Sequence, residues 1–112
     1  MSSFTIRVEL RGSPSAAVYE ILHARLATIG CRRFIVGVDR SGVQRTYRMP
    51  HAEYDLVSEM PFDEVRNTVH MLAEQVWPDA DVLVSEVINR AWHITPVPEI
   101  ARGLLGSIAA VG

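Results

Sequence analysis

The residues of this chain best suited to chemistry are its arginines, because all eleven basic side chains among its 112 residues are arginine. The first 50 residues carry eight of them against three carboxylates, whereas the rest of the chain carries three against ten. A guanidinium group binds phosphate or carboxylate through two parallel hydrogen bonds, so the positive half favours a nucleic acid or the acidic half of a second copy as partner. A general preference for arginine over lysine is a third explanation of the same counts.

Apolar and polar residues alternate from Phe4 to Arg11, which predicts a strand with one apolar and one charged face. The polar positions are Thr5, Arg7, Glu9 and Arg11. We expect them to line an open sheet face on which guanidinium groups gather to bind phosphate. The predicted nucleic-acid-binding residues are Arg7, Arg11, Arg33 and Arg48. The alternative is a solvated face whose arginines are balanced by carboxylates. Base stacking is not expected there, since Thr5 and Arg7 occupy the positions that aromatic side chains would need.

The absence of lysine excludes two classes of site, because a Walker loop and a Schiff-base enzyme both need a lysine amine. No glycine-rich dinucleotide fingerprint follows the first strand. We therefore expect no nucleotide cofactor. His51, Glu53 and Asp55 alternate as metal ligands would on one strand face, but they would spread over about 13 Å, and no metal is predicted. The single cysteine, Cys31, is predicted to be a buried apolar residue.

The periodicity along the chain predicts six elements. The first two are a strand over 4–11 and a helix from Pro14 to Ile29 capped by Ser13. A hairpin follows, with arms over Cys31–Val38 and Val43–Met49, and its second arm resumes after Pro50 over His51–Val57. The last two are a helix over Phe62–Val76 and a strand over Val82–Ile88. This order is βαββαβ. It predicts an α+β, ferredoxin-like fold, an antiparallel sheet with two helices on one face.

The length predicts one domain, which we place at 1–94, followed by an apolar C-terminal tail, 95–112, that is either flexible or docked in a dimer. Trp92 is the candidate interface residue, although an aromatic side chain just past a strand also caps cores. A small core favours a homodimer. No apolar run reaches the ~18 residues of a membrane span, and we expect a cytoplasmic protein.

Four segments resemble one family of small bacterial proteins. They are Phe4–Leu10, Tyr47–Tyr54, Val84–Glu86 and Arg90–Trp92. In order and spacing they are similar to the GhoS-like endoribonuclease antitoxins of type V toxin–antitoxin systems. The resemblance implies a ferredoxin-like fold shared with small CRISPR-associated nucleases, dimerisation, and cleavage of a toxin messenger RNA.

The chain departs from the nuclease pattern at the end of its first strand. The related CRISPR proteins have an aspartate there, where this sequence has Leu10-Arg11-Gly12. Glu9 is the nearest carboxylate, and it is the predicted catalytic residue, acting as a base or metal ligand while Arg7 and Arg11 stabilise charge on the phosphate. The resemblance therefore favours an RNA-directed regulator, and the alternative is a non-catalytic dimeric module that binds protein.

Overall fold

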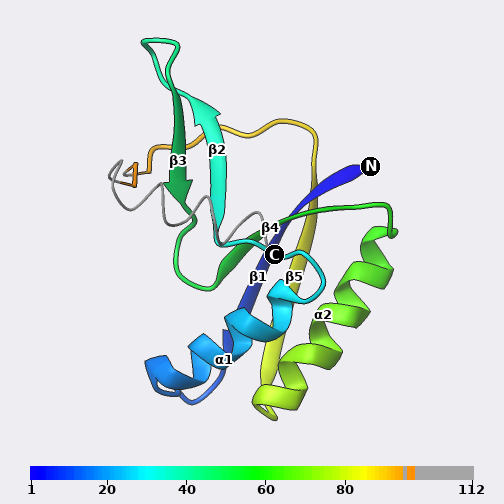
Figure 1. Ribbon diagram of the computed structural model, residues 1–112. Helices are drawn as coiled ribbons and strands as arrows, with labels where there is room; N and C mark the ends of the chain where they lie inside the picture. The colour runs from blue at the N-terminus through cyan, green and yellow to red at the C-terminus, as the bar shows by residue number, and fades with distance from the viewer. Residues whose placement is uncertain (95, 98–112) are drawn as a thin grey trace.

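The computed structural model describes residues 1–94, 96 and 97, so the predicted tail lies outside the described residues apart from Pro96 and Val97. Within these residues the chain is an α+β protein with two helices and antiparallel sheets (Figure 1). Its elements are β1 (Ser2–Leu10), α1 (Ala16–Ala27), β2 (Phe34–Val38), β3 (Gln44–Arg48), β4 (Glu53–Ser58), α2 (Phe62–Val76) and β5 (Ala80–Val87). In the described part of the chain, no helix is both long and apolar enough to cross a membrane.

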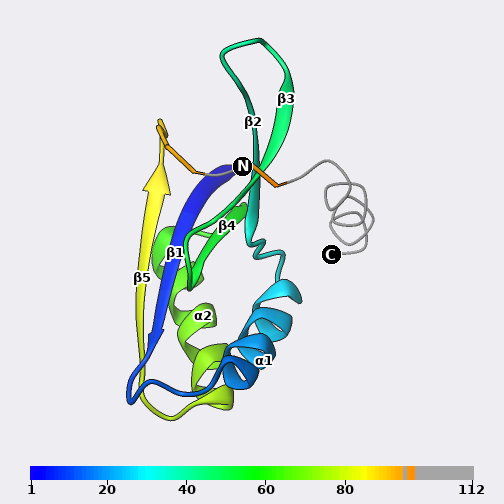
Figure 2. The same cartoon turned by 90° about the vertical axis from the view of Figure 1, so that its left-hand side faces the viewer.

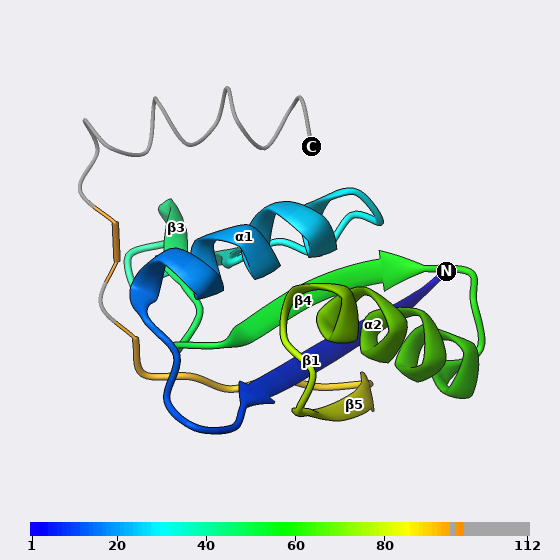
Figure 3. The same ribbon diagram turned by 90° about the horizontal axis from the view of Figure 1, so that it is seen from below.

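The main sheet has the strand order β4-β1-β5, and both pairings are antiparallel. Both helices lie on the same face of this sheet (Figures 2 and 3). The alternation predicted for the first strand is confirmed, since its apolar residues are buried under the helices. These residues are Phe4, Ile6, Val8 and Leu10, each at most 2 % exposed. The opposite face of the sheet therefore carries the polar residues of β1.

The second helix has the predicted bounds. Asp63 and Glu64 lie in its first turn, where the helix dipole favours negative charge, and its buried stripe is Val65, Val69 and Ala73. The first helix begins later than predicted, at Ala16. The predicted cap, Ser13, has a φ of +51° and lies in the loop before the helix, and the N-cap is Ser15.

The hairpin of β2 and β3 forms a sheet of its own instead of extending the main sheet as expected. The two sheets meet at Arg32 and Asp55, whose backbones exchange hydrogen bonds of 2.8 and 2.7 Å. The strand predicted to resume over His51–Val57 begins two residues later, at Glu53, because His51 and Ala52 form a turn in which Ala52 has a φ of +61°. The hairpin consequently projects beyond the sheet (Figure 1).

The chain after β5 returns to the hairpin. We call residues 88–94 with 96 and 97 the return segment. The Val97 N–H donates to the Thr46 carbonyl at 2.9 Å, and Trp92 packs edge-on against Tyr47 with ring centroids 5.5 Å apart. A small apolar cluster of Ile35, Tyr47 and Met49, with Ile94 against it, lies beneath these contacts. The return segment thus holds the hairpin on the body of the protein.

Candidate functional site

The four arginines predicted to bind phosphate lie in two separate places. Arg7 projects from the open face of β1, and Arg11 follows the end of that strand. Arg33 and Arg48 lie at the base of the hairpin, where Arg48 pairs with Phe34 and the Met49 N–H donates to the Arg33 carbonyl at 2.7 Å. The structure therefore does not bring the four predicted residues together as one group.

Of the two arginines near the open face, Arg11 is already neutralised. Arg11 donates from Nε and Nη2 to the two carboxylate oxygens of Asp81, at 2.9 and 3.1 Å, and this pairing raises the pKa of Arg11. Glu9 is exposed and lies opposite Asp81 in the β1–β5 register. Arg7 lies opposite Glu53 of β4, and its side chain makes no hydrogen bond or ion pair with the described residues. Arg7 is therefore the predicted open-face arginine that is available to a ligand.

The centre of the open face holds a buried ion-pair group that the sequence analysis did not anticipate. Asp55 is 5 % exposed, and its carboxylate accepts from Arg90 Nη1 at 2.9 Å and from Arg32 Nη2 at 3.2 Å. Arg90 also donates to the Thr5 hydroxyl at 2.9 Å. These guanidinium groups serve the fold, because they fix the return segment and the start of the hairpin to β4. Carboxylates thus balance much of the arginine charge on this face, in line with the alternative of a neutralised surface.

The second pair of arginines belongs to a compact polar group between α1 and the hairpin, which we call the hairpin-base cluster. It contains Tyr19, His23, Arg33, Arg48, His51 and Tyr54. The His51 ring packs on Tyr19 with centroids 4.7 Å apart, and Tyr19 in turn accepts the Leu10 N–H at 3.1 Å. The sequence carries one signal for this cluster, because Tyr19 and His23 are four residues apart and so share a helix face.

His23 is neutral at pH 7 in this cluster. Burial, together with Arg33 and more weakly His51 and Arg48, lowers the pKa of His23 to about 4. Burial also raises the pKa of Tyr54, so the Tyr54 hydroxyl keeps its proton and shares a hydrogen bond of 2.6 Å with His23 Nδ1. A neutral imidazole has one N–H donor and one nitrogen acceptor.

The two arginines of the cluster have few acidic neighbours. The nearest carboxylate to Arg33 is that of Glu20, at 3.9 Å, and this Glu20 side chain is 69 % exposed. Arg48 makes no ion pair or hydrogen bond with the residues that the structure describes. Guanidinium groups with so few acidic neighbours are suited to binding phosphate.

The alternating trio considered as metal ligands does not share one face. Glu53 and Asp55 lie on the open face of β4, whereas His51 precedes the turn at Ala52 and contacts Tyr19. No group of residues within 1–94, 96 and 97 has the arrangement of a metal site. Cys31 is buried, and burial raises the pKa of its thiol to about 12, as expected for an unreactive core residue.

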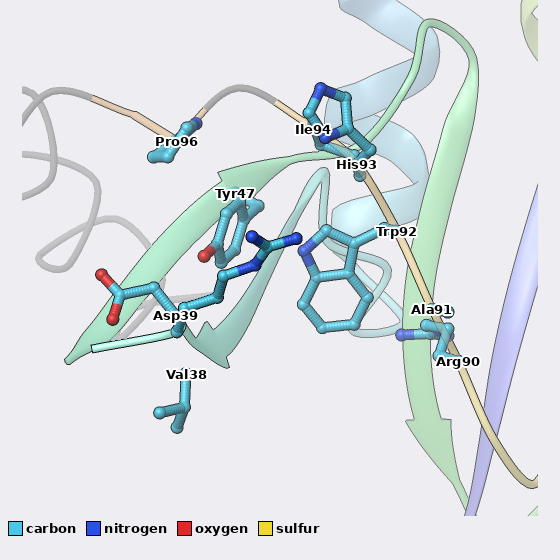
Figure 4. A pocket seen from close by; sticks show the side chains of 10 residues that line it. Val38, Asp39, Tyr47, Arg90, Ala91, Trp92, His93, Ile94 and Pro96 are labelled. Carbon is cyan, nitrogen blue, oxygen red and sulfur yellow. The ribbon is translucent and has the colours of Figure 1, made fainter. Parts of the chain in front are cut away.

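Trp92, predicted as an interface residue, contacts the hairpin of its own chain and remains 36 % exposed. It lines an open hollow of about 450 Å³ between the hairpin and the return segment (Figure 4). The other lining residues are Val38, Asp39, Arg40, Tyr47, Arg90, Ala91, His93, Ile94 and Pro96.

No protein-family model matches the chain, and no curated protein matches it. A solved structure with some similarity is that of protein SP2199 from Streptococcus pneumoniae. It shares 18 % sequence identity over 80 % of this chain and 89 % of that one, with a TM-score of 0.38. At that TM-score the two chains need not share a fold, and the function must be inferred from the residues of this chain.

Proposed function

We propose that the protein is an RNA-directed regulator that binds the phosphate backbone of RNA, as the resemblance to the GhoS-like antitoxins implies. The hairpin-base cluster supplies Arg33 and Arg48, and Arg7 adds a further cation from the open face. The observation that carries the proposal is that Arg33 and Arg48, both at the base of the hairpin, have no ion pair with the described residues other than the 3.9 Å contact between Arg33 and Glu20.

The proposal includes a ferredoxin-like origin of the fold. The order β4-β1-β5 with two helices on one face is that of three adjacent strands of such a sheet. The backbone bridge between Arg32 and Asp55 stands where a fourth strand would join β4. In this protein the fourth strand continues into the hairpin, which carries the hairpin-base cluster away from the sheet.

Phosphate binding is tested by the salt dependence of RNA affinity. We expect the logarithm of the binding constant for a short single-stranded RNA to fall linearly with the logarithm of salt concentration, with a slope of about −0.7 per phosphate neutralised. Arg33→Ala and Arg48→Ala should each weaken binding and reduce the slope by about 0.7. Arg66→Ala is the matched control, because Arg66 lies on α2 and bonds its neighbour Asn67. Binding that does not depend on salt, or equal effects of all three substitutions, would contradict the proposal.

Catalysis by Glu9 is a separate part of the proposal. Glu9 is exposed between Arg7 and Arg11 along β1, where a bound phosphate would meet both a carboxylate and a cation. Incubation of labelled RNA with the protein, with and without a chelator, measures cleavage. Glu9→Gln should abolish cleavage and leave the affinity for RNA intact, since the substitution removes a base and no cation. Equal cleavage by Glu9→Gln and the wild type would remove Glu9 from the mechanism.

A dimeric module that binds protein is the second candidate, and one observation favours it. The open face carries two exposed apolar side chains, Leu83 at 62 % and Val57 at 46 %, and β5 is an edge strand of the described sheet. A second copy could cover both. Sedimentation equilibrium on Leu83→Glu distinguishes the cases, because a dimer through this face should dissociate whereas the mass of a monomer should not change.

A further inference from the structure

The hollow beside Trp92, which we call the Trp92 hollow, is walled by aromatic and apolar groups. Trp92 stands edge-on to Tyr47, and Ile94 and Pro96 of the return segment complete the apolar lining (Figure 4). A volume of about 450 Å³ is within the range of small-molecule sites. The flat, partly exposed indole ring provides a surface on which a planar ligand can stack.

Two charged groups that line the hollow, Asp39 and Arg90, are engaged within the protein. Asp39 Oδ1 accepts the N–H groups of Ser41 and Val43 at 2.9 and 3.0 Å, and its Oδ2 accepts Arg45 Nε at 2.6 Å. The guanidinium of Arg90 is bound to Asp55 and Thr5. The carboxylate that lines the hollow is therefore not available to a ligand.

Arg40 differs from these groups. It lines the hollow, is exposed, and has no hydrogen bond or ion pair with the residues that the structure describes. The Trp92 hollow thus combines an aromatic surface with one available guanidinium group. A ligand that fits both is planar and carries a negative charge beside its ring system, and a nucleotide has this chemistry.

We propose that the Trp92 hollow binds an unpaired nucleobase of single-stranded RNA, with the base on Trp92 and an adjoining phosphate near Arg40. This inference rests on the proposed RNA binding and specifies the class of RNA. A base paired in a duplex is already stacked and cannot enter.

The test compares three probes with the full chain: a short single-stranded RNA, the same sugar-phosphate strand without bases, and an RNA duplex of equal length. Affinities are measured by fluorescence anisotropy. The intact strand should bind more tightly than the other two. Trp92→Ala should weaken binding of the intact strand about 5- to 150-fold, the effect of losing one stacked base, and leave the abasic strand unchanged. Trp92→Phe should restore most of the loss.

Arg40→Ala provides a second variant that does not disturb packing, because Arg40 is an exposed residue of the hairpin turn. It should weaken binding of the intact strand. Equal affinity for the intact and abasic strands, or wild-type affinity in the Trp92→Ala and Arg40→Ala variants, would overturn the inference. If Arg48→Ala still weakened binding in that case, the proposed function would stand without the base site. Absence of any RNA binding would overturn both.

Discussion

Replacement of Asp55 by asparagine should destabilise the protein strongly, because it removes the charge that two guanidinium groups share. Loss of one partner of a fully buried ion pair costs about 3–5 kcal/mol. The side chains of Arg90 and Arg32 are 25 % and 48 % exposed, so both retain some water. We therefore expect a smaller loss, about 2–3 kcal/mol of unfolding free energy.

Urea unfolding followed by far-ultraviolet circular dichroism measures this loss. The control is Asp81→Asn, which breaks the exposed pair with Arg11 and should cost less than about 1 kcal/mol. For a domain of this size, the Asp55→Asn loss should also lower the melting temperature by on the order of 10 °C. Arg90→Ala should cost more than Arg32→Ala, since Arg90 is the less exposed and makes the shorter contact with Asp55.

A loss in Asp55→Asn no greater than in Asp81→Asn would refute this reasoning. It would mean that the two guanidinium groups are well solvated and that the return segment is held by its apolar contacts. Equal losses in Arg90→Ala and Arg32→Ala would contradict the assigned order of the two contacts.

Three further predictions concern stability and reactivity. Because the pKa of His23 is lowered to about 4 in the folded state, the unfolded state takes up a proton first as the pH falls below 6.5. The unfolding free energy should therefore decrease as the pH falls from 6.5 to 4, by on the order of 1 kcal/mol because His23 is partly exposed. Urea titrations at several pH values measure this dependence, and His23→Gln should remove it. Cys31, whose thiol pKa is raised to about 12, should react with a disulfide reagent at pH 8 only after unfolding, and rapid reaction of the native protein would show an accessible thiol. In Gly37→Ala the new Cβ would lie 2.5 Å from Trp92 Cζ2, so the indole must move. We expect a loss of about 1–3 kcal/mol of unfolding free energy and a shift of the Trp92 fluorescence emission. Unchanged emission would mean that Trp92 does not pack against Gly37.

The elements that the sequence predicted well are those in which local signals agree. The second helix has a regular apolar stripe, a proline before it and a proline after it, so its bounds at Phe62 and Val76 are readable. The first strand alternates without interruption, and burial follows that alternation. The general α+β class and the antiparallel sheets follow from these elements and their order.

The separation of the hairpin from the main sheet could not be predicted from local sequence signals. It depends on the left-handed conformation of Ala52, which a residue other than glycine adopts rarely, and on contacts between Asp55 and Arg90, which are distant in sequence. The predicted placement of the arginines was wrong for the same reason. Arg33 and Arg48 were expected to share the open face of one sheet with Arg7, but the separate hairpin moves them toward α1.

The position of β1 in the sheet bears on how the protein forms during translation. β1 lies between β4 and β5, so neither neighbour exists while the first 50 residues are being made. The apolar side chains of β1 cannot be fully covered until Ala80–Val87 have been synthesised, and the return segment is synthesised later still. Such late, non-local pairing slows folding and leaves the nascent chain open to aggregation, so chaperones that shield emerging polypeptides should raise the yield of this protein.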